Sequence, residues 1–285
     1  MKKTIRMGVF NFLPDEPFLK LRFRLEVKRK LDLKNPKTFN EKLQWLKLHD
    51  RNPEYTKMVD KYEVRKYISE KIGEEYLIPL LGVWDSFDEI DFDALPEQFV
   101  LKCNHDSGGL VICKDKSKLD IKLARKKINK SLKRNFFKFT REWPYKNVKP
   151  RIIAEKYMVD ESGTELKDYK FLCFGGKAKF VEYHTGRFAG KHTQDFYDME
   201  WNKTTISQKG TMSDSLVEKP ILFEKMIEVT NILAEGIRHV RIDWYSINGK
   251  LYFGEITFFD SSGLCPFDNE NDDLYLGSLI DLKRG

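Results

Sequence analysis

The sequence predicts an α+β protein with helical and strand-rich regions that follow one another along the chain. Residues 1–75 carry helical patterns, short strands begin after Pro79, and hairpins dominate from Pro150 onward. The chain has 285 residues, of which 41% are hydrophobic and 33% are charged, as in folded globular proteins. No apolar run approaches the roughly 20 residues that a membrane span needs, and polar residues interrupt the first 18 positions where a signal peptide would lie.

Residues 1–75 are predicted to form a helical N-terminal region. The basic stretch 17–33 has apolar residues between its charges and favours a first helix. Thr38 followed by Glu41 is the pattern of a capping box, which begins a second helix. A third helix is expected over 55–72, ended by Gly73.

Residues 76–150 are predicted to form a small α+β subdomain. Strands are expected over 80–84, 98–103 and 110–113, and a helix over 121–139. One face of that helix is basic, through Lys122, Arg125, Lys126, Lys127, Lys130, Lys133 and Arg134. The simpler explanation is a solvated helix face, and the alternative is contact with an anionic membrane or glycan.

Residues 151–285 are predicted to form a C-terminal subdomain rich in strands. Its expected elements are a strand over 151–158, a hairpin of 168–174 and 177–183, a helix over 219–236, and a hairpin of 240–247 and 251–259.

The last hairpin carries two acidic residues, Asp243 and Glu255, among apolar neighbours. A clean two-residue turn at Asn248 and Gly249 would place the two carboxylates on opposite faces, because strand side chains alternate. We predict an odd-numbered loop or an equivalent bulge, which brings Arg241, Asp243, Glu255 and Thr257 to one face. Two converging carboxylates supply the oxygen ligands that Mg²⁺ prefers, and an ion pair with Arg241 or a lysine is the structural alternative.

Two further segments carry chemistry. Lys102 ends an apolar strand and leads into a loop that contains Ser107, Gly108 and Gly109, where backbone N–H groups can surround phosphate oxygens. Ordinary hairpin turns use the same residues. Glu155 interrupts the apolar strand 151–158, whose backbone can hydrogen-bond the edge of an adenine, and an ordinary edge strand is the alternative.

The net charge of +7 suggests an anionic partner such as a nucleotide, a glycan or a membrane surface. Nucleic acid is disfavoured because 44 acidic residues dilute the basic charge and no aromatic–basic reader motif is present. The 4 cysteines form no C-x-x-C pair, which disfavours zinc and thioredoxin chemistry. We expect reduced thiols and a cytoplasmic location.

Together and in this order, these segments resemble the ATP-grasp superfamily, and most closely its TupA-like branch, which occurs with bacterial teichuronopeptide, capsule and exopolysaccharide genes. The resemblance runs over nearly the whole chain and includes the strings 35–47, 59–62, 141–145 and 195–198. It implies two α+β subdomains whose antiparallel sheets hold Mg-ATP, with 76–150 as the lid subdomain after the helical N-terminal region.

The resemblance also implies roles for individual residues. The implied ATP contacts are Lys61, Lys102, His105, Ser107, Gly108, Gly109, Glu155, Lys156, Tyr157, Met158, Lys170, and Asp168 or Asp160 at the ribose. Glu155 would accept a hydrogen bond from the exocyclic amine of adenine. The implied Mg²⁺ ligands are Asp243, Glu255 and Thr257. Many relatives have asparagine where this chain has Thr257, which would be a weaker ligand.

The implied reaction is that of an ATP- and Mg²⁺-dependent carboxylate–amine ligase in capsule or exopolysaccharide biosynthesis. The γ-phosphate would pass to the carboxylate of a uronic acid or of an amino-acid donor, and an amine such as an amino acid would displace phosphate from the acylphosphate. Lys61, Lys102 and Lys170 would neutralise the moving charge, and Arg241 would hold the acylphosphate oxygen. The implied substrate contacts are Arg187, His192, Arg241, Ser261 and Ser262.

Three other functions stay open. A metal-dependent glycosyltransferase would use the acidic pair Asp91 and Asp93, which also fits a solvated loop. A sugar phosphotransferase on the same fold would leave a phosphorylated product. A non-enzymatic adaptor would bind glycan, or the inner face of the membrane, through the basic face at 122–134.

Overall fold

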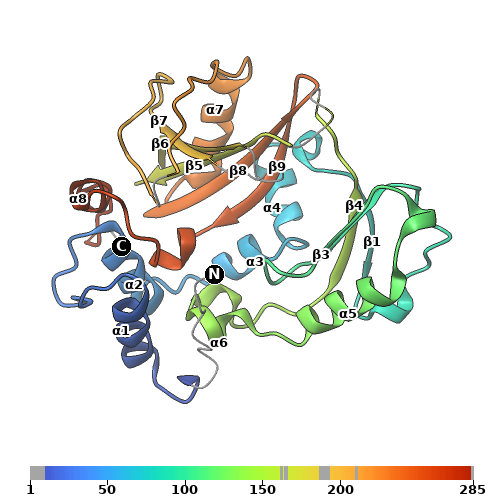
Figure 1. Ribbon diagram of the computed structural model, residues 1–285, viewed down its shortest axis with the longest axis horizontal. Helices are drawn as coiled ribbons and strands as arrows, with labels where there is room; N and C mark the ends of the chain where they lie inside the picture. Colours follow the sequence, from blue (N-terminus) through green and yellow to red (C-terminus); the bar gives the residue numbers. More distant parts are fainter. Residues whose placement is uncertain (1–9, 161–162, 164–165, 186–192, 209–210, 284–285) are drawn as a thin grey trace.

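The structure is a computed structural model that describes residues 10–160, 163, 166–185, 193–208 and 211–283. Its strands form two antiparallel sheets, one of four strands in the order β1-β4-β2-β3 and one of five in the order β7-β6-β5-β8-β9. Figure 1 shows the sheets in separate lobes, with α3 (Glu54–Val59) and α4 (Val64–Lys71) between them. The predicted α+β class and its antiparallel sheets are therefore confirmed.

The N-terminal helices begin as predicted but are shorter. α1 covers Asp15–Glu26 and stops well before residue 33, because Lys28 takes a left-handed conformation with φ of 67°. α2 covers Phe39–His49 and opens with the predicted capping box. The backbone N–H of Glu41 donates to the Thr38 hydroxyl at 3.2 Å, and the Thr38 N–H donates to the Glu41 carboxylate at 3.1 Å.

The single helix predicted over 55–72 is wrong, because the chain breaks between α3 and α4. The carboxylate of Asp60 accepts the backbone N–H of Tyr62 at 2.8 Å and the side-chain amide of Asn104 at 2.9 Å. These bonds compete with helix hydrogen bonding and hold the break against the smaller lobe. Gly73 does end α4, with φ of 118°.

The smaller sheet consists of β1 (Leu80–Trp84), β2 (Phe99–Cys103), β3 (Leu110–Cys113) and β4 (Ile152–Lys156). Helix α5 (Ile121–Leu132) packs on it through Ala124 and Ile128, which share a core with Phe99 and Leu101. The predicted helix over 121–139 divides into α5 and α6 (Phe136–Thr140). Because β4 pairs with β1 and β2, this sheet extends past the boundary we place at residue 150.

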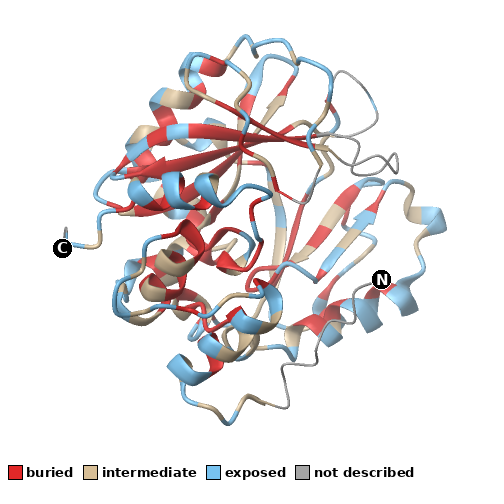
Figure 2. Ribbon diagram, turned by 60° about the vertical axis from the view of Figure 1, so that its left-hand side comes forward, coloured by how far each residue is buried: buried red, intermediate tan, exposed pale blue. Residues whose placement is uncertain are grey.

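The larger sheet contains both predicted hairpins. Its strands are β5 (Asp168–Phe174), β6 (Lys177–Thr185), β7 (Thr193–Tyr197), β8 (His239–Ile247) and β9 (Lys250–Thr257). Helix α7 (Phe223–Ala234) covers one face, where the indole N–H of Trp244 donates to the Thr230 hydroxyl at 2.8 Å. Figure 2 shows these strands as mostly buried. The opposite face carries charged side chains and looks toward the smaller lobe.

The N-terminal helices join the core of the larger lobe. Phe39 packs edge-on against His239 with ring centroids 5.0 Å apart, and α2 also packs against α8 (Glu270–Ser278). At that contact a Cβ on Gly277 would lie 2.2 Å from the Lys37 carbonyl oxygen, so only glycine fits. All 4 cysteines lie among the described residues, are buried and form no disulfide. No helix among the described residues is long and apolar enough to cross a membrane.

Candidate functional site

A bulge in the β8–β9 hairpin brings the predicted carboxylates to one face. The turn itself has two residues, Asn248 and Gly249, with φ of 50° and 73°, so the odd-numbered loop is wrong. The pairing shifts instead between Ile242 and Trp244, where two residues of β9 lie opposite Asp243. This is the equivalent bulge that we predicted.

A glycine, Gly254, occupies the bulge. A Cβ on Gly254 would lie 3.0 Å from the backbone oxygen of Asp243, which is a tight contact. Beyond the bulge, Arg241 pairs with Thr257 and Ile242 with Ile256. The side chains of Asp243, Glu255, Arg241 and Thr257 therefore share one face of the sheet, as predicted.

Arg241 is the centre of this charged face. Its Nε and Nη2 donate to the two carboxylate oxygens of Asp243, each at 2.8 Å, and Nη2 also donates to Glu255 at 2.9 Å. Its Nη1 donates to Asp260. Burial alone would lower the pKa of Arg241, but Asp243, Asp260 and Glu255 outweigh it and raise that pKa well above its usual value. The guanidinium is therefore held permanently charged.

Lys170 joins the same cluster from β5. Its ammonium donates to Asp243 and lies 2.8 Å from a carboxylate oxygen of Asp168. Burial and Arg241 act to lower the pKa of Lys170, yet the carboxylates dominate and raise it. Asp243 is in turn held ionised, because Arg241 and Lys170 overcome the burial that would raise its pKa.

The donor set on this face fits Mg²⁺ in type, because Asp243, Glu255 and Thr257 all present oxygen atoms. Their present partners are cations: both Asp243 oxygens bind Arg241, as the ion-pair alternative expects. The Glu255 side chain is 40% exposed and has room for a further ligand. Among the residues the structure describes, no group of three or more histidine, cysteine or acidic residues is arranged to hold a metal ion by itself.

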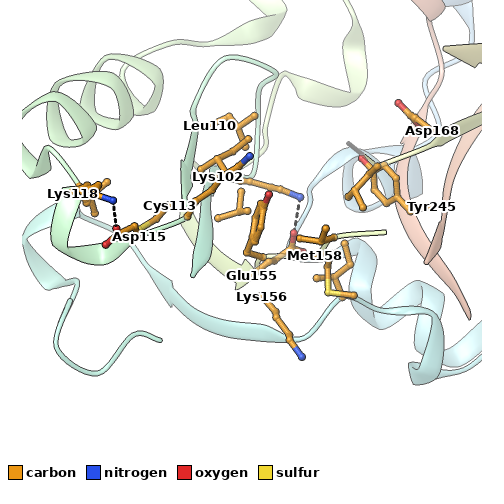
Figure 3. A pocket seen from close by; sticks show the side chains of 18 of the residues that line it. Lys102, Leu110, Cys113, Asp115, Lys118, Glu155, Lys156, Met158, Asp168 and Tyr245 are labelled. Carbon is orange, nitrogen blue, oxygen red and sulfur yellow. Dashed lines mark hydrogen bonds and ion pairs between the residues drawn. The ribbon is translucent and has the colours of Figure 1, made fainter. Parts of the chain in front are cut away.

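A cavity of about 750 Å³ lies between the two sheets. Its walls include the apolar residues Val100, Leu110 and Ile112. The predicted residues that line it are Lys102, Glu155, Lys156, Tyr157, Met158 and Asp168. Figure 3 shows Asp168 and Tyr245 of the larger sheet facing this group across the opening. Asp160 is buried and is not among the lining residues.

Lys102 and Glu155 meet inside this cavity. The Lys102 ammonium donates to one carboxylate oxygen of Glu155 at 2.6 Å (Figure 3). Arg65 donates to the other oxygen at 3.3 Å. The Glu155 carboxylate is therefore already engaged by two cations. An adenine amine would have to share this carboxylate with Lys102 and Arg65. Residues 156–159 follow Glu155 along the cavity wall.

The glycine-containing loop folds onto its own aspartate. Backbone N–H groups of Gly108 and Gly109 donate to Asp106 at 3.1 and 3.0 Å. Burial would raise the pKa of Asp106, but hydrogen bonds from Ser131 and these N–H groups lower it. A phosphate would compete with Asp106 for both N–H groups. His105 is buried toward α5, where its Nε2 lies 3.1 Å from the Ser131 carbonyl oxygen, and it is absent from the linings of both large cavities.

A second cavity, of about 680 Å³, begins on the other side of Arg241 and Glu255. Its cationic lining residues are Arg22, Lys61, Arg134 and Arg241. Its aromatic lining residues are Phe136, Phe139, Tyr145 and Phe259. The predicted residues Ser107, Thr257, Ser261 and Ser262 line it as well. Arg187 and His192 lie outside the described residues.

A small third cavity, of about 20 Å³, shares lining residues with both large cavities and is called the junction below. It is lined by Lys61 and Glu255 on the side of the second cavity and by Lys102 and Glu155 on the side of the first. The Lys61 ammonium donates to the backbone oxygen of Asp106 at 2.8 Å, which places it under the glycine loop. The cations that line the junction are therefore Lys61, Arg65 and Lys102.

Several residues of the site were not predicted. Asp260 binds Arg241, Asp106 holds the glycine loop, and Glu142 lines the second cavity close to the buried Lys47. Glu142 and Lys47 lie within strings that resemble the family, and Asp106 lies in the glycine-containing loop, so a charged residue inside each of these segments was the available signal. No local sequence pattern marked Asp260, because it lies after the end of β9 and meets Arg241 through the folding of the chain.

The acidic pair considered for a glycosyltransferase lies elsewhere. A carboxylate oxygen of Asp91 accepts the backbone N–H of Asp93 at 3.0 Å in an exposed turn. Neither residue lines either of the two cavities. The pair is therefore a turn-forming feature in this structure.

Solved structures that are similar to this chain include several ligases at low identity. The D-alanine–D-alanine ligase from Helicobacter pylori is 14% identical, with 87% of this chain and 70% of that chain covered and a TM-score of 0.43. An L-amino acid ligase from Bacillus licheniformis is 12% identical, with 88% and 55% covered and a TM-score of 0.45. The D-alanine–D-alanine ligase from Bacillus anthracis is 16% identical, with 70% and 57% covered and a TM-score of 0.40. The chain thus spans little more than half the length of the two Bacillus enzymes.

No curated protein sequence matches the chain. A family model described as TupA-like ATPgrasp matches residues 41–281, which include both sheets, the first cavity and the bulged hairpin. The chain therefore belongs to the TupA-like ATP-grasp family.

Proposed function

We propose that this protein is an ATP- and Mg²⁺-dependent ligase that joins a carboxylate to an amine through an acylphosphate. Membership of the ATP-grasp family supports the reaction class. The observation that carries the proposal is the junction, which shares Lys61 and Glu255 with the second cavity and Lys102 and Glu155 with the first. Such a junction suits a phosphoryl group that moves from a nucleotide in one cavity to an acid in the other.

The first cavity is the proposed nucleotide site. Its apolar walls at Val100, Leu110 and Ile112 suit an adenine ring, whose edge would meet the backbone of 156–159. Lys102 and Lys61 would attract the phosphates toward the junction. Asp243, Glu255 and Thr257 would hold Mg²⁺, which when bound neutralises phosphate charge and polarises the transferred group.

The second cavity is the proposed acid and amine site. Its four cations, Arg22, Lys61, Arg134 and Arg241, suit a carboxylate substrate, since guanidinium groups bind carboxylates through paired hydrogen bonds. Its aromatic rings provide flat apolar surface of the kind that ligand cavities use, here for the face of a sugar. These features support a uronic-acid type of carboxylate, with an amino acid as the amine.

In the proposed reaction the carboxylate oxygen attacks the γ-phosphorus and ADP leaves. Arg241 faces the second cavity and is held charged, so it can stabilise the oxygen of the acylphosphate. The amine nitrogen then attacks the carbonyl carbon, the C–N bond forms and phosphate departs. Closing the cleft against water would protect the acylphosphate.

Bacterial capsule or exopolysaccharide synthesis is the proposed setting. The basic face of α5 is exposed at each of the basic residues from 122 to 134. Leu123 on the same helix is 61% exposed, which adds an apolar contact for an anionic membrane or lipid-linked glycan. The direct test is vesicle flotation with anionic and neutral lipids.

The activity test is an ADP-release screen with Mg-ATP. Glucuronate, galacturonate and mannuronate are each combined with single amino acids, and product masses are measured. We expect ADP release only when acid and amine are both present. The mass of the product should equal the mass of the uronate plus that of the amine minus water. A product heavier by one phosphate would instead show a sugar phosphotransferase, and no ADP release with any pair would contradict the proposal.

A further inference from the structure

One face of α2 binds the loop that follows β9. The side-chain amide of Asn40 donates to the Cys265 carbonyl oxygen at 3.0 Å. One turn later, the amide of Gln44 donates to the carbonyl oxygens of Ser262 and Gly263 at 3.0 and 2.8 Å. Lys47 completes the row by donating to the Ser262 carbonyl oxygen at 2.9 Å. Helical spacing places the three side chains in line, so they hold this loop as a unit.

The loop held in this way is conformationally unusual. Ser261 and Ser262 both take left-handed φ values, 46° and 59°, which cost energy for residues other than glycine. Both residues line the second cavity. The bonds from Gln44 and Lys47 therefore maintain a costly conformation where the substrate is proposed to bind.

A chain of hydrogen bonds leads from Lys47 to a carboxylate at the second cavity. The Lys47 ammonium donates to the Ser262 hydroxyl oxygen at 2.8 Å, and the Ser262 hydroxyl in turn bonds to the Glu142 carboxylate. Glu142 is only 4% exposed, and that exposure is toward the cavity it lines with Thr140 and Ser262. A buried carboxylate on a substrate cavity is costly, and nothing in the proposed phosphoryl transfer uses it.

The charges around Glu142 come from several elements. Lys47 of α2 and Arg22 of α1 stabilise its ionised form, and Thr140 contributes a hydroxyl. Glu26 of α1 lines the same cavity, and Tyr145 lies near enough for Glu142 to raise the pKa of its phenol. Burial still prevails, so the pKa of Glu142 is raised, while burial lowers the pKa of Lys47 to about 7. Glu142 is thus a stronger base than an exposed glutamate.

We propose that Glu142 binds the ammonium group of the acceptor and takes its proton, so that the free amine can attack the acylphosphate. This inference rests on the proposed ligase function. The ammonium gives one proton to the Glu142 carboxylate. The amine lone pair then forms the C–N bond while the bond from carbon to the phosphate oxygen breaks. The second nitrogen proton leaves with the phosphate, and Glu142 returns its proton to solvent. Lys47 and Ser262 are positioning residues that hold the carboxylate.

Replacing the amine substrate by hydroxylamine tests the role of Glu142 separately from phosphoryl transfer. Hydroxylamine is unprotonated at neutral pH and traps an acylphosphate as a hydroxamate, so it needs no base. The test compares wild type with Glu142→Gln, using the uronate and amino acid that release most ADP in the screen. We expect hydroxamate formation to stay within about threefold, and amide formation to fall by at least about 100-fold. Amide formation by the variant should recover partly at high pH, where the amine is already deprotonated.

The control is Glu54→Gln, which removes an exposed carboxylate on α3 that pairs with the nearby Lys57 and should change neither rate. Equal loss of amide and hydroxamate in folded Glu142→Gln would overturn the inference and leave the ligase function intact. If that variant does not fold, Glu142→Asp decides in the same way, with a selective loss of amide expected. Absence of hydroxamate in wild type with every uronate would instead contradict the proposed function itself.

Discussion

Arg241 and Asp243 lie two residues apart on β8 and are joined side-on by two hydrogen bonds, each of 2.8 Å. The Nη2 atom that binds Asp243 also reaches Glu255 across the bulge. The Arg241 guanidinium therefore binds both carboxylates that are proposed to hold Mg²⁺. The same group faces the second cavity, which links the metal side of the site to the proposed acid side.

Replacing Glu255 by glutamine should remove activity without unfolding the protein. The side chain is 40% exposed, so its loss has little effect on the core, but it removes the carboxylate most open to Mg²⁺. We expect ADP release to fall by at least about 100-fold and the melting temperature to change by less than about 3 °C. Full activity in Glu255→Gln would remove this residue from the metal site.

Replacing Arg241 by methionine should destabilise the fold strongly. Asp260 is almost fully buried and would lose the arginine that binds it, and the buried Asp243 would lose one of its two cationic partners while keeping Lys170. Breaking a buried ion pair on one side typically costs about 3–5 kcal/mol. Urea denaturation should report a loss of this size for Arg241→Met, against less than about 0.5 kcal/mol for the exposed Arg125→Met. A loss below about 1 kcal/mol in Arg241→Met would show that the carboxylates are not held by this arginine.

Lys102→Ala should weaken nucleotide binding. The ammonium lies in the first cavity and is bound by Glu155, so its removal leaves that carboxylate facing the phosphates with less positive charge. Isothermal titration calorimetry with a non-hydrolysable ATP analogue and Mg²⁺ should show affinity reduced by at least about tenfold. The exposed Lys57→Ala is the matched control. Unchanged affinity in Lys102→Ala would place the phosphates elsewhere.

The sequence predicted features whose cause is local. The capping box at Thr38 and Glu41 needs only residues three apart, and both hairpins follow from alternation and turn residues. Same-face placement of Asp243 and Glu255 was predictable, because acidic residues among apolar strand neighbours favour a shared partner. A bulge at Gly254 brings the two side chains to one face, because the turn at Asn248 and Gly249 is a regular two-residue turn.

Features set by distant contacts were not predictable. The break between α3 and α4 depends on Asp60, whose carboxylate binds Asn104 from the smaller lobe. Helical periodicity over 55–72 contains no sign of that contact. The inward turn of the glycine loop likewise depends on Ser131 of α5, which hydrogen-bonds Asp106 from another element. Side chains whose partners lie far along the chain need the fold before their role is visible.

Stability should depend on His239 as the pH falls. The ring is buried between Phe39 and Phe174, its Nδ1 lies 2.9 Å from the Cys173 carbonyl oxygen, and burial lowers the pKa of His239 to about 4. Because the unfolded chain binds the proton near pH 6.5, this histidine's contribution is complete above that pH and is lost as pH falls toward 4. The loss amounts to about 3 kcal/mol.

His239→Gln keeps a donor for Cys173 and removes the titration. Urea denaturation at a series of pH values should therefore show a shallower fall in unfolding free energy for the variant between pH 6.5 and 4. Parallel curves for the two proteins would mean that His239 takes up its proton equally well in the folded state.

A crystal structure with a non-hydrolysable ATP analogue and Mg²⁺ tests the two-cavity arrangement most directly. We predict adenine against Val100 and the backbone of 156–159, phosphates along Lys102 and Lys61, and a metal ion bound by Glu255 at the entrance to the second cavity. Nucleotide density outside the cleft between the sheets, or a metal ion remote from the bulged hairpin, would contradict the account.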